Sequence, residues 1–157
     1  MPLSPIFEWL ARTEVATAIN QSPYLMGLLS SVHLLGLTLI VGSSIVSCLR
    51  CLGLLLPEQP LSDVARPVGN GIVLGLAVCL ATGFLMFAPR ATTAVKDSAF
   101  QMKMILLLAA VVFHFTLYRY VMRSDATRPP LLRLTGVLGL TLWFGVGFAG
   151  CAFAVFD

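Results

Sequence analysis

Long apolar stretches without a charged side chain dominate the pattern of the chain. Residues 15–49, 67–89 and 134–156 contain no Asp, Glu, Lys or Arg. Each stretch reaches the ~20 residues that a helix needs to cross a hydrocarbon core about 30 Å thick. Because an unpaired charge is costly in lipid, these stretches predict three transmembrane helices.

A fourth apolar stretch is interrupted only by Lys103 near one end and Arg119 near the other. Both side chains are long enough to extend toward the headgroups, so this stretch can also cross the membrane. The expected transmembrane helices are residues 24–50, 67–88, 100–122 and 131–154.

Prolines and short connections separate the expected spans. Pro67 is expected to open the second span and Pro89 to close it. Because short connections make neighbouring helices antiparallel, we expect an all-α, up-down four-helix bundle that is integral to the membrane. The first and third spans then run parallel, and residues 1–157 form a single domain.

The segment at residues 4–20 predicts a short helix that lies at the membrane surface. Ser4 can cap its first turn, and Pro5 suits that turn. Its apolar and aromatic side chains, Phe7 and Trp9 among them, are typical of an interfacial helix.

Composition supports a membrane protein and narrows its partners. Hydrophobic residues make up 58% of the chain and charged residues 11%, less than half of the ~25% typical of a soluble domain. The mean hydropathy of +0.93 makes the lipid bilayer the expected partner, and a net charge of +3 does not indicate nucleic acid. No acidic residue lies in an expected span, which argues against a pump that uses buried carboxylates.

The basic residues predict an orientation. The N-terminal segment and second loop carry Arg12, Arg90, Lys96 and Lys103, and the first and third loops carry Arg50, Arg66, Arg119, Arg123, Arg128 and Arg133. By the positive-inside rule, this excess places the first and third loops in the cytoplasm and both termini outside, in the periplasm of a bacterium.

His33 lies inside the first span, on the side of the helix that carries Gly36, Ser44, Ser47 and Cys51. This small and polar stripe is expected to face the other helices. Gly36 lies one turn from the imidazole and is expected to leave space for a flat ligand. A histidine within the membrane is a functional candidate, and a hydrogen bond to a neighbouring helix is the alternative use of its ring.

His114 lies inside the third span, eleven residues after Lys103. The two side chains are expected on one face of the helix, ~16 Å apart, with Tyr118 one turn further on. The alternatives are a lysine that extends to the headgroups and a histidine that only packs against its neighbours.

Histidines on two parallel spans favour axial ligation of a b-type haem. Imidazole is a common ligand of haem iron, and a membrane bundle offers an apolar slot for the porphyrin. Arg90, with Lys96 and Lys103, can bond the propionates near the expected outer surface. The helical rise puts His33 ~14 Å and His114 ~21 Å below that surface, whereas two axial ligands need nearly the same depth.

Two other uses of these residues stay open. Copper handling would employ His33 and His114 as metal ligands together with Met or Cys, but the methionines are scattered singly along the spans. Cys48 and Cys51 have the spacing of a redox or metal pair, and helix packing by small thiols is the alternative. In a non-catalytic assembly subunit the histidines would only pack and form hydrogen bonds. No motif assigns an enzyme class.

Several short motifs resemble the CopD-like superfamily of bacterial membrane proteins over about residues 28–123. They are Val32-His33-Leu34-Leu35-Gly36, Val41-Gly42, Leu49-Arg50, Thr82-Gly83, and the run from Phe100 through Lys103 to Leu108 that leads to His114. The likeness is greatest to the uncharacterised four-span members. It implies a multi-pass protein of the bacterial inner membrane.

The Lys-to-His spacing in the third span is also similar to that in the membrane protoporphyrinogen oxidase family. In that family a first-span histidine and the third-span lysine are associated with haem. The resemblance implies that either His33 and His114 or His33 and Lys103 flank a haem b. The expected function is that of a cytochrome b-like electron-transfer protein, as a homo-oligomer or a subunit of a larger redox complex.

Overall fold

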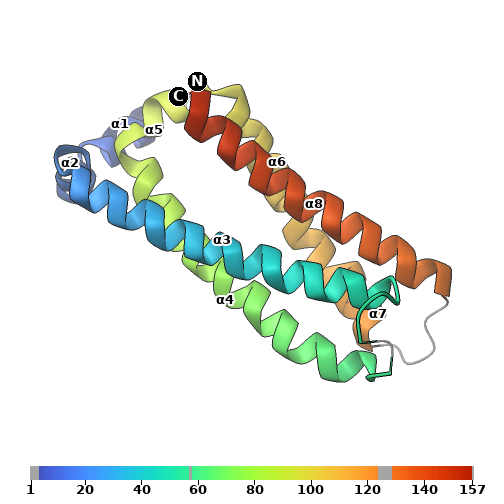
Figure 1. Cartoon of the computed structure of the whole chain (residues 1–157). Helices are drawn as coiled ribbons and strands as arrows, with labels where there is room; N and C mark the ends of the chain where they lie inside the picture. Colours follow the sequence, from blue (N-terminus) through green and yellow to red (C-terminus); the bar gives the residue numbers. More distant parts are fainter. Residues whose placement is uncertain (1–3, 57, 124–128, 157) are drawn as a thin grey trace.

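The computed structural model describes residues 4–56, 58–123 and 129–156, and these are helical, without a strand (Figure 1). The elements are α1 (Ser4–Ala11), α2 (Glu14–Gln21), α3 (Pro23–Cys51), α4 (Leu61–Phe87), the 3-10 turn η1 (Ala88–Arg90), α5 (Ala91–Ala94), α6 (Ser98–Phe113), the π-helix η2 (His114–Tyr118), α7 (Arg119–Arg123) and α8 (Pro129–Phe156).

Four helical stretches of the described chain are long and apolar enough to cross a membrane. They are Pro23–Cys51, Leu61–Ala94, Ser98–Val121 and Pro129–Gly150. The four predicted spans are thus confirmed as helices of suitable length and hydropathy. Large apolar side chains are exposed on their outer faces, as lipid-facing positions require: Leu35 is 69% exposed, Ile105 65% and Phe148 73%.

The prediction that Pro67 opens the second span is wrong, because α4 begins six residues earlier, at Leu61. Pro67 cannot bond the carbonyl of Asp63 from its ring nitrogen. Both residues are exposed, so solvent can bond that carbonyl instead. Pro89 follows directly on the end of α4, as expected.

The predicted helix at residues 4–20 is divided into α1 and α2. At the break, the hydroxyl of Thr13 donates to the Leu10 carbonyl at 2.8 Å and accepts from the Ala16 N–H at 3.3 Å. Thr13 is therefore the N-cap of α2. A single helix was the wrong expectation, because the threonine satisfies the backbone locally and starts a new helix.

Aromatic rings join α1 to the chain between the second and third spans. Phe87, at the end of α4, stacks on Phe100 of α6 at 5.2 Å between ring centroids. The ring of Phe7 meets Phe87 edge-on at 6.1 Å. α1 lies beside η1 and α5 at this end of the molecule (Figure 1).

The long helices pack mainly as two pairs. α3 lies along α4, α6 lies along α8, and α8 also contacts α3 (Figure 1). The backbones of α3 and α4 approach closely at two glycines: a Cβ added to Gly75 would lie 2.7 Å from the carbonyl oxygen of Gly36. Small residues permit this approach, which gives close van der Waals packing in lipid.

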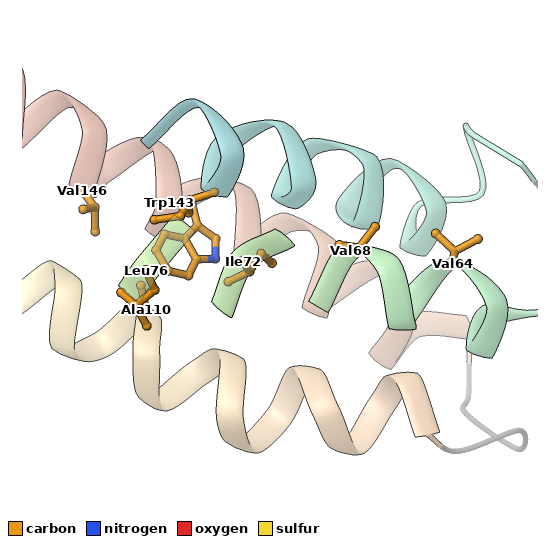
Figure 2. Packing of buried hydrophobic residues seen from close by; sticks show 8 residues of the cluster. Val64, Val68, Ile72, Leu76, Ala110, Trp143 and Val146 are labelled. Atoms are coloured by element: carbon orange, nitrogen blue, oxygen red, sulfur yellow. The ribbon is translucent and has the colours of Figure 1, made fainter. Parts of the chain in front are cut away.

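A buried cluster joins the two pairs. Trp143 reaches from α8 towards Ile72 and Leu76 of α4, and the cluster also includes Ile40 of α3 and Ala110 of α6 (Figure 2). Trp143 is 3% exposed, so its indole fills the space where the helices meet.

Replacing Gly75 by alanine is expected to lower the thermal stability of the purified protein in detergent. The added methyl would overlap the Gly36 carbonyl and the Ile40 side chain, and such overpacking costs about 1–3 kcal/mol. Gly69→Ala is the matched control, because nothing lies within 4 Å of a Cβ at that position of the same helix. Equal losses of Tm in both variants would contradict the prediction.

Candidate functional site

The imidazole of His33 is held by Thr82 of α4. The two are joined by a hydrogen bond of 2.8 Å between His33 Nδ1 and Thr82 Oγ1. Thr82 Oγ1 also donates its only proton to the Val78 carbonyl, at 2.7 Å. The hydroxyl must therefore accept from His33, so that Nδ1 carries the proton and Nε2 of the neutral ring has a free lone pair.

The His33 residue packs against one face of α4. A Cβ added to Gly83 would lie 3.3 Å from His33 Cε1, so the glycine gives the imidazole room beside the helix. Cys79 Sγ lies 3.5 Å from the His33 carbonyl oxygen, as a weak donor. Cys79, Thr82 and Gly83 share a face because they are three and four residues apart.

Lys103 of α6 approaches the same site from the other pair of helices. Its ammonium acts electrostatically on both His33 and Cys79. Gly150 of α8 makes room for the lysine, since a Cβ there would lie 3.5 Å from Lys103 Nζ. The side chain is partly buried. Lys103 is thus near enough to His33 for its charge to act on the ring.

His114 lies at a different level along the helices. It begins the π-helix η2, where its ring stacks on Tyr118 at 4.8 Å between centroids and 19° between planes. It lines a cavity together with Ser44 and Ser47 of α3. Ser44 is eleven residues beyond His33, or ~16 Å along the helix. The structure therefore does not bring His33 and His114 together.

The levels of His33 and His114 differ because pairs of residues on α3 and on α6 have the same separation along the chain. α3 and α6 run in the same direction (Figure 1), and eleven residues separate both His33 from Ser44 and Lys103 from His114. The lysine consequently lies near the first-span histidine, and the third-span histidine lies beside the serine.

The expectation that Gly36 leaves space for a flat ligand is wrong. A Cβ on Gly36 would lie 2.9 Å from Cys79 Sγ, 3.0 Å from Val78 and 3.1 Å from the Gly75 carbonyl. The space beside the glycine is filled by α4. The rest of the predicted stripe, Ser44, Ser47 and Cys51, is buried against the other helices as expected.

The remaining candidate residues lie apart from His33 or have a packing role. Arg90 is exposed in η1, in the connection between the second and third spans. Cys48 and Cys51 are buried thiols. They face α8, where a Cβ on Gly139 would lie 2.9 Å from Cys48 Sγ and one on Gly136 3.2 Å from Cys51 Cβ.

Sequence reasoning missed the role of Thr82 and the π-helix. Thr82 is one of the few polar residues of the second span and precedes Gly83, which is the signal that could have marked it as a partner for a histidine. The π-helix has no comparable signal, because nothing in residues 114–118, His-Phe-Thr-Leu-Tyr, distinguishes a π-helix from an α-helix. π-Helical turns are rare and occur frequently at functional sites.

The described residues contain no group of three or more His, Cys, Asp or Glu side chains that could hold a metal ion. Such a group does not include methionine, which copper also uses as a ligand. A haem iron differs from a bare metal ion, because the porphyrin itself supplies four ligands and the protein adds one or two.

These features define a helical protein with four apolar helices that fit a multi-pass membrane protein and with a histidine held between two of them. The chain belongs to a family of unknown function, DUF6644, which it matches over residues 6–155. The match includes every residue of the His33 and His114 sites. No curated protein and no solved structure matches the chain.

The tautomer of His33 provides a direct test of this site. In protein labelled with ¹⁵N-histidine, we expect His33 to carry its proton on Nδ1, and Thr82→Val to abolish that preference because the acceptor is lost. Thr135→Val is the control, since Thr135 is also buried and donates to the carbonyl four residues earlier. An Nε2-protonated His33 in the unmodified protein would refute the assignment.

Proposed function

We propose that this protein binds a haem b through His33 and takes part in electron transfer within a membrane. The observation that carries the proposal is the Thr82 hydrogen bond, which fixes the proton on Nδ1 and directs the lone pair to Nε2. Histidines that ligate metals are commonly oriented in this way, by a partner on the second ring nitrogen. The resemblance to haem-associated families in the first and third spans adds support.

The arrangement around His33 supports this proposal. His33 Nε2 would hold the haem iron, with its ring oriented by Thr82 and given room by Gly83. Lys103 would flank the haem from the α6–α8 side, and its electrostatic effect on His33 favours it over His114 as the second partner. Arg90 would bond a propionate near the end of the second span.

The bound haem would supply one-electron transfer. The protein's own contribution would be to hold the imidazole in one tautomer, to keep a cation beside the site, and to surround it with apolar helices. We further propose that the chain acts as a homo-oligomer or as a subunit of a larger redox complex, to which it would offer its exposed apolar faces.

Reduced-minus-oxidised spectra of protein expressed with ample haem test the proposal. We expect a Soret band and its loss in His33→Ala, whereas His114→Ala should keep the band. Lys103→Arg separates two roles of the lysine, because arginine keeps the charge but does not ligate iron. If the spectrum of Lys103→Arg is unchanged, Lys103 pairs with a haem propionate. If the spectrum changes, Lys103 ligates the iron. Colourless protein would refute the proposal.

We also propose that the four helices form an up-down bundle in a bacterial inner membrane with both termini in the periplasm. The six arginines at the first and third loops support this orientation.

Reporter fusions test the orientation. A periplasm-active reporter should be active when fused after Asp157 and inactive when inserted in the first loop, near Glu58. Reversing the excess of basic residues, by changing Arg66 and Arg133 to Gln and adding two lysines at the N-terminus, should weaken or invert this pattern. Activity of the first-loop fusion in the unmodified chain would contradict the orientation.

A further inference from the structure

A small cavity lies where the first, second, third and fourth spans meet. Its volume is about 10 Å³, which is close to the space that one water molecule occupies. It is lined by Ser44, Ser47, Cys48, Ile72, Phe113, His114, Tyr118, Gly139 and Trp143. It lies about 16 Å along the helices from the His33 site and shares no residue with it.

Two polar atoms at this cavity have no hydrogen-bond partner within the described part of the chain. They are Ser44 Oγ and His114 Nδ1. Both residues are 3% exposed. A buried polar group without a partner destabilises the folded protein, and two at one cavity indicate a shared partner.

The orientation of Ser44 supports such a partner. Hydroxyls elsewhere on the long helices, including those of Ser30, Thr38 and Thr135, donate to the backbone carbonyl four residues earlier. Ser44 has the same option in its own helix but does not take it. Its hydroxyl therefore lies in a position that suits a group within the cavity.

The π-helix brings further polar groups to this place. It stacks the rings of His114 and Tyr118, and the Tyr118 hydroxyl bonds Ser47 of α3. Polar groups of α3 and of η2 consequently face one another across the cavity.

We propose that this cavity binds one water molecule, which bonds both Ser44 Oγ and His114 Nδ1 and links α3 to the π-helix. A water molecule has two protons and two lone pairs, so it can serve either tautomer of the histidine and the hydroxyl at once. An apolar ligand would leave both atoms unsatisfied. No charged side chain lines the cavity to balance an ion. The water site is independent of haem binding, because it involves neither His33 nor Lys103.

The direction in which Ser44→Ala changes Tm tests the proposal. If a water molecule bonds Ser44, Ser44→Ala removes one of its partners and should lower Tm by about 2–4 °C. If the cavity is dry, the same change removes an unsatisfied hydroxyl and should leave Tm unchanged or raise it. Ser30→Ala is the matched control on the same helix, and we expect it to change Tm less than Ser44→Ala does.

A crystal structure at a resolution that shows ordered water gives the second measurement. Density within hydrogen-bond distance of both Ser44 Oγ and His114 Nδ1 supports the proposal, and an empty cavity overturns it. The haem spectrum should be the same in Ser44→Ala as in the unmodified protein. An empty cavity in a protein with the expected haem spectrum would therefore overturn only this inference. An ordered water in a protein without a Soret band would overturn only the proposed function.

Discussion

The approach of α3 to α4 at Gly36 and Gly75 is the contact on which the candidate site depends. The two backbones come so close there that neither glycine can carry a Cβ without displacing its neighbours. Because α4 is rigid, this contact also fixes the turns that follow, where Thr82 and Gly83 meet His33. In lipid, where apolar surface gives helices no reason to associate, such close packing and a few polar contacts must hold the helices in register.

The spans could be predicted because a charge in lipid is costly, so gaps between charged residues mark the helices. The inward face of α3 could be predicted for the same reason, from Ser44 and Ser47. The partner of His33 could not, because it depends on how far α4 slides along α3, and the sequence of one helix does not encode that register. The 3.6-residue period likewise could not show the π-helix at His114, because no residue type there distinguishes a π-helix from an α-helix.

The depths of the histidines show both the value and the limit of counting residues. The helical rise indicated that His33 and His114 lie at different depths, and the structure places them at different levels. Counting residues did not show which side chain lies near each histidine. The equal spacing of His33 to Ser44 and of Lys103 to His114 was present in the sequence, but only the parallel placement of α3 and α6 turns it into two separate pairings.

The cluster around Trp143 and Ile40 has a consequence for how independent the two histidine sites are. Ile40 lies on α3 between His33 and Ser44, and Ile72 and Trp143 line the cavity beside Ser44 and His114. Apart from Trp143, the buried members of this cluster are aliphatic (Figure 2). Aliphatic side chains offer no hydrogen-bonding group that would join His33 and Thr82 to Ser44 and His114. The polar contacts of one histidine are therefore separated from those of the other by apolar packing.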